Sequence, residues 1–382
     1  MEFVYHNPTQ IHFGQNSLNA LPELIPAEAK ILVLYGGGSI KANGVYQEVS
    51  AALRGHTWLE FGGIEPNPSI ETLRKAIELV RAQHIDFILA VGGGSVIDGA
   101  KLVAAASHYQ GDAWDLLSKQ YKPQTAIPLG VVLTLAATGS ESNMIAVISN
   151  KATQEKRSFY LPITRPRFAL LNPVYLRSLP ARQLQNSLVD AFVHVCEQYL
   201  TYPAGGLVQE GYALAILKTL RHLAEHYAQH EELWWCENLM WAANQALCGI
   251  VGVGMPQDWG SHRIGVELTA LYGIDHARTL SIIQPALLQE TIDAKRERLA
   301  QIAQAVFQLE GRAQLAIDAI RKMYIDLEMP THLHDAKIID PNAPTLILNA
   351  LRNKGLSNLG THADLNELKI ARILQAACCH DV

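Results

Sequence analysis

The sequence is short of cysteine and of charge, and it contains no long apolar run. Its 382 residues include five cysteines, an odd number, and none has the CxxC spacing of a zinc or redox motif. Scattered thiols of this kind argue against a disulfide framework and favour a reducing compartment. No apolar run reaches the roughly 18 residues that span a bilayer, and the start MEFVYHNPTQ lacks the basic and apolar regions of a secretory signal. We therefore expect a cytoplasmic protein that does not enter a membrane.

The low charge also limits the possible partners. Charged residues make up 18% of the chain and the formal net charge is −5, whereas hydrophobic residues make up 49%. No basic excess favours nucleic acid or anionic lipid, so neither is expected as a partner. The apolar content is typical of a globular protein with a large interior. A chain of this length exceeds one ordinary core, so about two or three domains are expected.

The first half of the chain alternates short apolar runs with amphipathic stretches. Residues 30–35 (KILVLY), 85–91 (IDFILAV) and 126–135 (AIPLGVVLTL) each lead into small residues, and residues 71–83 have apolar positions at helical spacing. This alternation predicts an α/β domain with a parallel, Rossmann-like sheet and crossover helices. Because the strands are apolar throughout, both faces of the sheet should be covered.

Beyond Leu179-Pro180 the pattern becomes helical and strand signals nearly vanish. We predict a boundary near 178–181, with an α/β domain at 1–179 and an all-helical domain at 180–382. The expected helices are 181–200, 207–228, 231–251, 258–272, 278–308 and 311–327.

Two glycine turns follow predicted strands, one at 36–39 and one at 92–95, and both read Gly-Gly-Gly-Ser. Neither fits GxGxxG, because Lys41 and Ile97 stand where the third glycine would be, and neither is a Walker loop. Glycines after strands are often only tight turns. Two such turns at successive strand ends of one parallel sheet favour a phosphate-binding crevice.

The first turn also bears on the choice of cofactor. A site for NAD commonly presents a carboxylate to the adenosine ribose, yet residues 36–41 contain no acid. Ser39 and Lys41 could instead accept a 2′-phosphate, which favours NADP(H) over NAD(H). The alternative is that Lys41 is merely a solvated surface residue.

Histidines and one aspartate in the second half suggest a metal site. Asp190 and His194 are four residues apart, so on a helix they share a face, with their Cβ atoms about 6 Å apart. His262 and His276 would be roughly 21 Å apart on one straight helix, so the chain must bend, and residues 272–275 (YGID) supply a break. Three imidazoles and a carboxylate suit Fe²⁺ or Zn²⁺ better than Mg²⁺ or Ca²⁺.

Spacing alone does not single out these four residues. His222, His226 and His230 have cleaner helical spacing, although the acids and the arginine around them are typical of a solvated helix face. His332 and His334 form a further pair near the C-terminal end.

Several blocks together resemble the iron-containing (group III) alcohol dehydrogenases, in particular their NADPH-dependent aldehyde reductase and butanol dehydrogenase branch. No block is decisive alone, but their order and spacing cover almost the whole chain. The blocks are NPTQIHFG (7–14), YGGGSIKANGVY (35–46), EFGGIEPNP (60–68), LAVGGGSVIDGAK (89–101), LTLAATGSESN (133–143), VDAFVHVCEQY (189–199), GMPQDWGSH (254–262) and HARTL (276–280).

The resemblance implies a dinucleotide-binding α/β domain, an all-helical metal domain of the dehydroquinate synthase-like architecture, an active site in the cleft, and a homodimer. It implies that Asp190, His194, His262 and His276 are catalytic and bind one divalent metal. It also implies a catalytic role for Asp98, a family acid at the nicotinamide end of the cleft. The cofactor-binding positions that it implies are Gly36, Gly37, Gly38, Ser39, Asn67, Gly92, Gly93, Gly94, Ser95, Thr134, Thr138, Ser140, Lys156 and Tyr175.

Three positions relate this chain to particular branches of that family. The acidic ribose-binding residue of the NAD-using relatives falls on Gly37, which supports NADP(H). Many members carry a further cleft histidine where this chain has Val266, so a proton relay through that position is absent or moved. The usual Asp-Pro entering the second domain is here Asn172-Pro173.

The expected reaction interconverts aldehydes and primary alcohols by hydride transfer with NADP(H), with the metal as Lewis acid on the substrate oxygen. Phe192, Trp259, Leu268 and Tyr272 are candidates for apolar cleft walls, although each could equally be core. Two alternatives stay open. One is a sugar-phosphate cyclase-type lyase of the same architecture, which needs more basic residues than 181–280 offers, and the other is a non-catalytic metal- or nucleotide-binding relative.

Overall fold

The computed structural model describes residues 1–361 and 365–378, and the chain divides into two compact units. The α/β unit contains residues 6–180 and 231–244. The helical unit contains residues 1–5, 181–230 and the described residues from 245 onward. The main break between Pro180 and Ala181 lies next to the predicted boundary. The segments 1–5 and 231–244 each belong to the unit opposite to the one that a single boundary would give them.

The α/β unit is built on a parallel six-stranded sheet with the strand order β1-β8-β5-β4-β2-β3. This is the predicted class of sheet. A separate antiparallel hairpin, β6 with β7, lies outside it. The elements are β1 (Gln10–Phe13), α1 (Leu21–Leu24), β2 (Lys30–Tyr35), α2 (Ser39–Ala42), α3 (Val45–Ala52), β3 (Thr57–Phe61), α4 (Ile70–Gln83), β4 (Phe87–Gly92), α5 (Gly94–Ala106), α6 (Trp114–Leu117), β5 (Leu129–Leu133), β6 (Ile145–Asn150), β7 (Glu155–Tyr160) and β8 (Phe168–Leu171).

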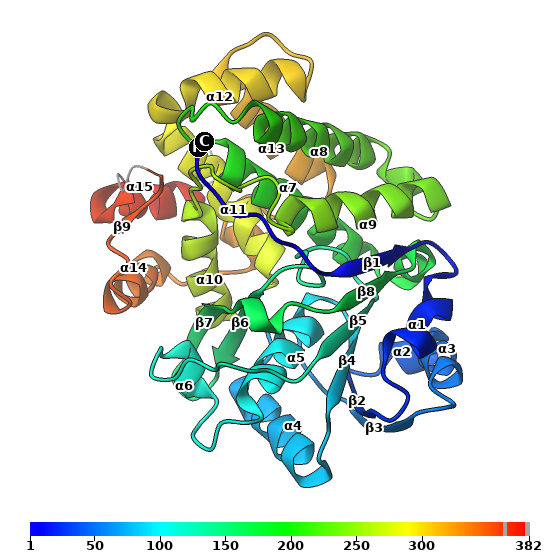
Figure 1. The fold of residues 1–382 in the computed structure, drawn as a ribbon. Helices are drawn as coiled ribbons and strands as arrows, with labels where there is room; N and C mark the ends of the chain where they lie inside the picture. Colours follow the sequence, from blue (N-terminus) through cyan, green and yellow to red (C-terminus); the bar gives the residue numbers. More distant parts are fainter. Residues whose placement is uncertain (362–364, 379–382) are drawn as a thin grey trace. The chain divides into compact units, whose positions relative to one another are not determined.

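Both faces of the parallel sheet are covered, as the apolar strand sequences predict. All residues of β4 and β5 are buried, and so are five of the six residues of β2. Helices α1 to α3 cover one face, with alternate side chains of β2 and β4 in their core, while α4 and α5 lie on the other face (Figure 1). In the hairpin, β6 alternates between buried and half-buried residues, which is the period-two pattern of a strand with one covered face.

The two glycine turns lie side by side at the point where the strand order reverses. From β2 the chain first adds β3 on one side of the sheet and then crosses to add β4 on the other. Tyr35 at the end of β2 pairs with Val91 near the end of β4, so the turns at 36–39 and 92–95 leave adjacent strands and lead to opposite faces. Ligands of open α/β folds bind in the crevice at such a reversal.

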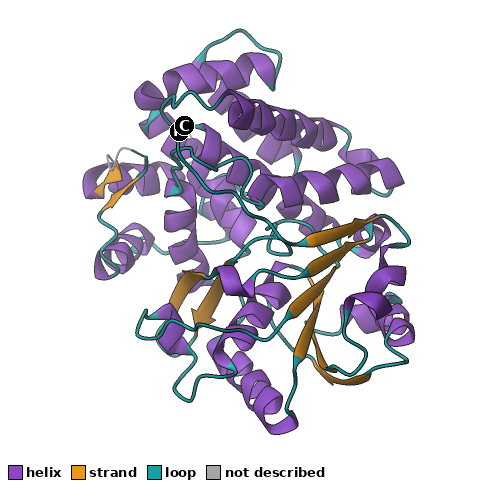
Figure 2. Cartoon of the chain, viewed as in Figure 1, coloured by secondary structure: helices purple, strands orange, loops and turns teal. Residues whose placement is uncertain are grey.

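Helices make up nearly all of the helical unit, as the purple ribbons of Figure 2 indicate. Its central helix α7 packs against α8 and α11, and α11 in turn packs against α10, α13 and α15. The elements are α7 (Ala181–Tyr199), α8 (Leu207–Glu225), α10 (Gly260–Tyr272), α11 (His276–Glu290), α12 (Ile292–Ala305), α13 (Ala313–Asp326), α14 (Ala343–Asn353), α15 (Glu367–Cys378) and a short β9–β10 pair (Asn358–Leu359 and Leu365–Asn366). Helix α9 (Leu233–Leu247) is divided: residues up to 244 belong to the α/β unit, and the rest belong to the helical unit.

The predicted bend between His262 and His276 is present. Helix α10 ends at Tyr272, Gly273 follows it in the left-handed conformation with a φ of 69°, and α11 begins at His276. Glycine adopts this conformation without the steric penalty of a Cβ, which makes it a common helix terminator. The single helix predicted at 278–308 is wrong, because Thr291 ends α11 and precedes α12. The apolar periodicity continues across this break and therefore does not reveal it.

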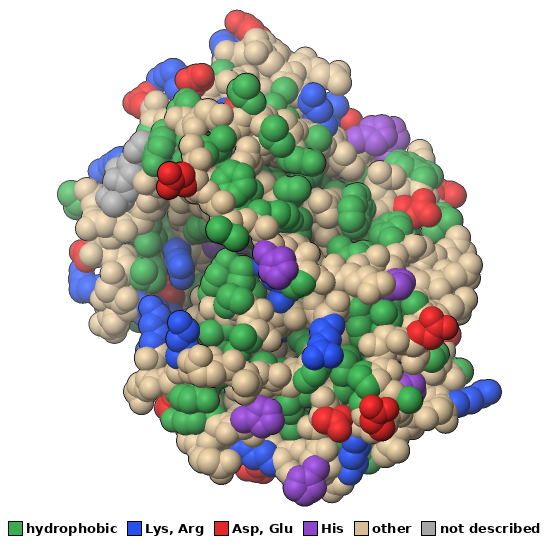
Figure 3. All heavy atoms as spheres, in the orientation of Figure 1, with side chains coloured by type: hydrophobic (Ala, Val, Ile, Leu, Met, Phe, Trp, Pro, Cys, Tyr) green, Lys and Arg blue, Asp and Glu red, His purple; other side chains and the backbone are tan. Residues whose placement is uncertain are grey.

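None of the helices in the described part of the chain has the length and apolar character needed to cross a membrane. On the face drawn in Figure 3, basic and acidic side chains of the described residues are interspersed among apolar and neutral ones.

Candidate functional site

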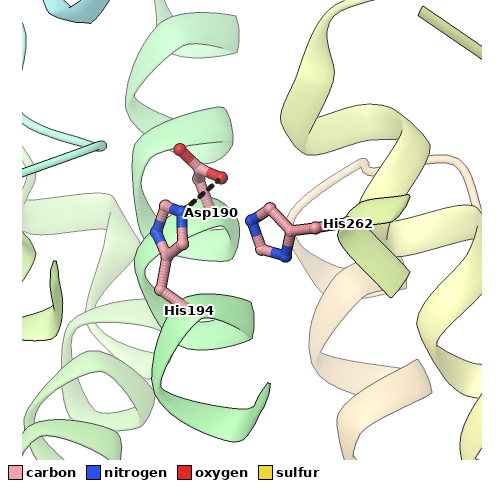
Figure 4. Close-up of side chains that lie close together, drawn as sticks. All are labelled: Asp190, His194 and His262. Atoms are coloured by element: carbon pink, nitrogen blue, oxygen red, sulfur yellow. Dashed lines mark ion pairs between the residues drawn. The ribbon is translucent and has the colours of Figure 1, made fainter. Parts of the chain in front are cut away.

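Asp190, His194 and His262 converge inside the helical unit. Asp190 and His194 project from one face of α7, and His262 points toward them from the first turn of α10 (Figure 4). Their ligand atoms all lie within 4.8 Å of one another. The side chains of Asp190 and His194 are each 5% exposed, and 3.8 Å separates Asp190 Oδ1 from His194 Nε2. A carboxylate and two imidazoles thus lie together, and two of the three side chains are almost inaccessible to solvent.

His276, the fourth predicted ligand, adjoins this group. It is the first residue of α11, directly after the break that ends α10. Its ring meets the His262 ring edge-on, with 5.1 Å between the ring centroids. Among the described residues it stands outside the set whose ligand atoms are all within 4.8 Å.

The protonation of the two central imidazoles suits a metal ion. Burial, followed by the neighbouring His262, holds the pKa of His194 well below its usual value, so this ring is neutral. His262 Nδ1 hydrogen-bonds to the carboxylate of Glu197, which can only accept, so its proton is on Nδ1 and the lone pair is on Nε2. His194 Nδ1 and His262 Nε2 are buried and have no hydrogen-bond partner among the described residues. Imidazoles with unused nitrogens beside a carboxylate fit a divalent cation.

Three further hydrogen bonds connect α7 to the starts of the helices that carry the other histidines. Glu197 accepts a hydrogen bond from the Ser261 backbone N–H at 2.5 Å, in the first turn of α10. Asp275, immediately before α11, accepts from Arg182 Nε at 2.7 Å and from Asn186 Nδ2 at 2.9 Å. Our sequence prediction did not include Glu197, although it lies seven residues after Asp190 on the same helical face, and that spacing was the available signal.

Trp259 adopts a left-handed backbone conformation, with a φ of 61°, just before α10 begins. A side chain in this region costs on the order of 1–3 kcal/mol and persists where surrounding contacts hold it. Its indole N–H donates to Gln257 Oε1 at 2.9 Å. Its ring packs edge-on against His194 and His262, with centroid distances of 6.3 and 5.2 Å. Trp259 therefore forms part of the wall of the histidine group.

The other proposed cleft residues divide between core and surface. Phe192 is fully buried and packs on Phe307 and Tyr324, and Leu268 is fully buried as well, so both belong to the core. Tyr272 is half-buried, and its hydroxyl donates to Asp340 Oδ2 at 3.0 Å.

The rival histidine row forms a second, exposed group. Ligand atoms of His222, Glu225 and His226 also lie within 4.8 Å of one another, but His222 and Glu225 are exposed and Glu225 is ion-paired with Arg221. His332 is buried and faces Thr331, outside both of the groups that the described residues form. Asp190 and His194 are buried and His262 is half-buried, whereas the group around His222 is mostly exposed.

Close packing requires the glycines of the second turn. A Cβ on Gly92 would lie 2.6 Å from Val96, and one on Gly94 would lie 2.5 Å from the Thr138 hydroxyl. The first turn is more open, because a Cβ on Gly37 would meet nothing within 4 Å and its φ is not left-handed. The helix α5 begins at the second turn, and its first N–H groups point to the same strand ends.

Three predicted cofactor-binding residues are connected by hydrogen bonds in the α/β unit, one of them through its backbone N–H. Lys156 Nζ donates to Asn67 Oδ1 at 2.8 Å, and the Asn67 N–H donates to Ser95 Oγ at 3.3 Å. Asn67 has a left-handed φ of 57°. These hydrogen bonds join β7 to the start of α5, so residues far apart in the sequence meet at the second glycine turn.

Asp98 and Ser140 belong to a buried polar cluster. Asp98 accepts from Ser140 Oγ at 2.6 Å and from the Val147 N–H at 2.9 Å. Lys101 Nζ donates to Ser140 Oγ at 2.8 Å and to Asn143 Oδ1 at 3.0 Å. Burial raises the pKa of Asp98 and lowers that of Lys101 to about 8. This arrangement fixes α5 to the segment 140–147.

The remaining predicted cofactor residues lie in or beside the sheet. The Thr134 N–H donates to the Gly92 carbonyl at 3.1 Å, and the Ser140 N–H donates to Thr138 Oγ1 at 3.3 Å. Tyr175 is buried in the core, where its hydroxyl donates to Glu48 Oε2 at 2.5 Å. Burial and then Glu48 raise the pKa of the Tyr175 hydroxyl.

Lys41 has a partner that the local sequence does not indicate. Its ammonium lies 2.8 Å from Glu60 Oε1 at the end of β3 and sits over the rings of Tyr35 and Tyr46. The hydrogen bond to Glu60 raises the pKa of Lys41, and the hydrogen bond from Lys41 lowers the pKa of Glu60. A 2′-phosphate would therefore compete with Glu60 for this ammonium.

Comparison with known proteins agrees with the fold. Residues 8–173 match the iron-containing alcohol dehydrogenase family, and residues 185–378 match the C-terminal domain of Fe-containing alcohol dehydrogenases. The chain belongs to the iron-containing alcohol dehydrogenase family. The resemblance inferred from the sequence blocks is thereby confirmed, and with it the class of enzyme, an alcohol dehydrogenase or aldehyde reductase.

Relatives in this family match the chain over nearly its whole length. The NADPH-dependent aldehyde reductase YqhD of Escherichia coli (strain K12) is 47% identical over 98% of this chain and 99% of its own. Probable NADH-dependent butanol dehydrogenase 1 of Bacillus subtilis (strain 168) is 36% identical, with the same coverage. A crystal structure of E. coli YqhD superimposes with a TM-score of 0.95 at 45% identity, covering 98% of both chains.

Proposed function

We propose that this protein is a metal-dependent, NADP(H)-linked aldehyde reductase that also oxidises primary alcohols. The observation that carries the proposal is the group of two imidazoles and one carboxylate formed by the buried Asp190 and His194 and the half-buried His262. The 47%-identical relative is named as an NADPH-dependent aldehyde reductase, which supports the substrate class and the cofactor. The 36%-identical butanol dehydrogenase is named for NADH, so the preference for NADP(H) rests on this chain's own residues as well.

We propose that the helical unit is the metal-binding domain, with Asp190, His194, His262 and His276 holding one Fe²⁺ or Zn²⁺. A divalent cation there would supply Lewis-acid polarisation of the substrate oxygen, and the nicotinamide would supply or accept the hydride. The chain's own contribution is to keep His194 neutral, to orient His262 through Glu197, and to exclude water through the packing of Trp259.

The α/β unit is proposed as the dinucleotide-binding domain. The turns at 36–39 and 92–95 leave adjacent strands at the reversal of the sheet. There the absence of Cβ atoms lets backbone N–H groups approach a pyrophosphate. The chain Lys156–Asn67–Ser95 and the hydroxyl of Thr138 provide the polar groups around the second turn. Thr134, Ser140 and Tyr175 stay predicted cofactor contacts, and Asp98 a predicted catalytic residue.

The step with no evident donor side chain at the expected position is delivery of a proton to the substrate oxygen. Val266, on α10 one turn beyond His262, is half-buried and cannot carry a proton. Reduction of an aldehyde adds a hydride to carbon and needs one proton on oxygen, so we propose that water supplies this proton. The homodimer and the cytoplasmic location expected from the sequence stay predictions.

The lyase alternative is disfavoured by the chemistry of the helical unit. Of the few basic residues between 181 and 280, Arg182 is ion-paired with Asp275, and Arg221 with Glu225. Phosphate and carboxylate of a cyclase substrate need several such cations. A cyclase also regenerates its cofactor in each turnover and so consumes no net cofactor. An aldehyde reductase oxidises one NADPH for each aldehyde that it reduces.

The decisive experiment is an NADPH-oxidation assay with straight-chain C2 to C8 aldehydes, using chelated protein and protein reloaded with Fe²⁺ or Zn²⁺. We expect one NADPH oxidised per aldehyde reduced, with loss on chelation and return on reloading. Asp190→Ala and His276→Ala should abolish the activity, whereas His226→Ala in the exposed row is the matched control and should retain it. Full activity of either ligand variant would overturn the proposed site, and binding of NADPH without turnover of any aldehyde would favour a non-catalytic relative.

A further inference from the structure

We propose that Glu197 is a positioning residue for the metal site, because it fixes both the tautomer of His262 and the start of α10. This inference rests on the proposed metal site and assigns a role to a side chain outside its ligand set. Glu197 lies on α7 at i+7 from Asp190 and i+3 from His194, so all three share one helical face. Its side chain is 5% exposed, so its carboxylate acts on neighbouring protein groups instead of on solvent.

One oxygen of the carboxylate determines which nitrogen of His262 is available. Oε2 of Glu197 accepts the hydrogen bond from His262 Nδ1. With the proton held on Nδ1, the lone pair of the neutral ring is on Nε2, and this buried nitrogen has no hydrogen-bond partner among the described residues. A carboxylate behind an imidazole ligand also raises the basicity of the ring and fixes its orientation.

The same carboxylate also fixes the start of the helix that carries His262. Oε1 of Glu197 accepts from the Ser261 N–H at 2.5 Å, and the His262 N–H lies 3.4 Å from Oε2. These are donors of the first turn of α10, which have no partner within the helix. Their attraction to a negative charge is the ordinary preference of a helix N-terminus for an anion. The same carboxylate thus holds the backbone and the ring of one proposed ligand at a fixed distance from the other two.

These two roles respond differently to the isosteric change Glu197→Gln. The Gln oxygen can still accept from the Ser261 N–H and so retain the helix cap. Its NH₂ group would face His262 Nδ1 and donate to it, so the ring proton would move to Nε2. That tautomer has no lone pair toward Asp190 and His194. A purely structural residue would tolerate the change, whereas a positioning residue for the metal would not.

The test measures metal binding in the full-length protein after removal of metal. Competition with a chromophoric chelator gives the Zn²⁺ dissociation constant, the visible spectrum of the Co²⁺-loaded protein reports ligand geometry, and thermal unfolding of the metal-free protein reports the fold. We expect Glu197→Gln to weaken Zn²⁺ binding by about 10- to 100-fold and to alter the Co²⁺ spectrum, with little change in metal-free unfolding.

Glu267→Gln is the matched control, because Glu267 is a buried carboxylate on α10, the helix that carries His262. It pairs with Lys354 at 2.6 Å. It should lower thermal stability and leave the Zn²⁺ constant unchanged. If Glu197→Gln does not fold, Glu197→Asp keeps the charge but retracts it by one methylene, and it should weaken Zn²⁺ binding by a smaller factor. Native Zn²⁺ affinity and an unaltered Co²⁺ spectrum in a folded Glu197 variant would overturn this inference. Failure of the unaltered protein to bind Zn²⁺ or Co²⁺ would instead overturn the proposed metal site, and this inference with it.

Discussion

At the scale of single residues, Gly37 and Lys41 bear on whether the proposed cofactor site prefers NADP(H) or NAD(H). Gly37 leaves open space where the NAD-using relatives are expected to carry an acid, since a Cβ there would meet nothing within 4 Å. Lys41, the cation that we propose for a 2′-phosphate, is already paired with Glu60. The missing charge at Gly37 is therefore the simpler determinant of cofactor choice, because it needs no rearrangement of another side chain.

Gly37→Asp should move cofactor preference from NADPH toward NADH. A carboxylate near a 2′-phosphate repels it by about 1–4 kcal/mol, depending on solvent exposure. The ratio of the two dissociation constants should therefore change roughly fivefold or more. Fluorescence titration of each reduced cofactor measures the ratio. Gly37→Asn is the control of equal size without charge. An equal shift in both variants would point to size, and no shift in either would mean that the ribose lies elsewhere.

At the scale of elements, α7 is the frame on which the histidine group is built. Asn186, Asp190, His194 and Gln198 follow one another at intervals of four residues, and Glu197 lies beside them. Asn186 holds the residue before α11, Glu197 holds the start of α10, and Asp190 and His194 are proposed ligands. A second buried pair, Asp258 with Lys295, braces the loop before α10 against α12.

Asp258→Asn should destabilise the metal-free protein, because it leaves the Lys295 ammonium buried without its counter-ion. The two side chains are 5% and 8% exposed, and removal of one partner of such a pair costs about 3–5 kcal/mol. The double variant Asp258→Asn with Lys295→Met should recover much of this loss. Denaturant unfolding of the three proteins measures the effect. A double variant as unstable as the single one would contradict the role of the uncompensated charge.

The same pair predicts a pH dependence. Burial alone would raise the pKa of Asp258, but the Lys295 ammonium and the N–H groups of Gly260 and Thr361 lower it below its ordinary value. An acid with a lowered folded pKa stabilises the fold above its unfolded pKa of about 3.9, and this stabilisation is lost as the pH falls through the folded value. The difference in unfolding free energy between the unaltered protein and Asp258→Asn should therefore be constant near neutral pH and shrink below about pH 4.

At the scale of the whole molecule, the proposed ligands and the proposed cofactor contacts lie in different units. Asp190, His194, His262 and His276 all belong to the helical unit, whereas both glycine turns belong to the α/β unit. Each unit has a core of its own. Metal binding and cofactor binding should therefore be separable in experiment.

Removal of the metal should lower the thermal stability of the protein and leave NADPH binding in place. A ligand at one hundred times its dissociation constant stabilises the folded state by about 2.7 kcal/mol, and here that gain belongs to the unit formed by α7, α10 and α11. Calorimetry with and without chelator measures the loss, and NADPH fluorescence measures the retained affinity. Reloading with Zn²⁺ is the control for reversibility. Loss of NADPH binding on chelation would contradict the separation of the two sites.

The sequence by itself determined the features that depend on local periodicity and on backbone conformation. Apolar runs ending in glycines specify β2, β4 and β5, and a helical period specifies α4 and most helices after Pro180. The bend at Gly273 also followed from the sequence, because two histidines fourteen residues apart cannot meet on one helix. These inferences need only neighbouring residues and the geometry of one element.

The tertiary structure decided which distant groups meet. It distinguished the buried set around Asp190 from the better spaced but exposed row at His222, since burial depends on packing between helices. It also paired Lys41 with Glu60 and His262 with Glu197, and it placed residues 231–244 in the α/β unit. Each of these contacts joins elements far apart in the chain, and local periodicity carries no information about such partners. The sequence showed which residues could bind a metal, but the fold decided which of them lie close enough together to do so.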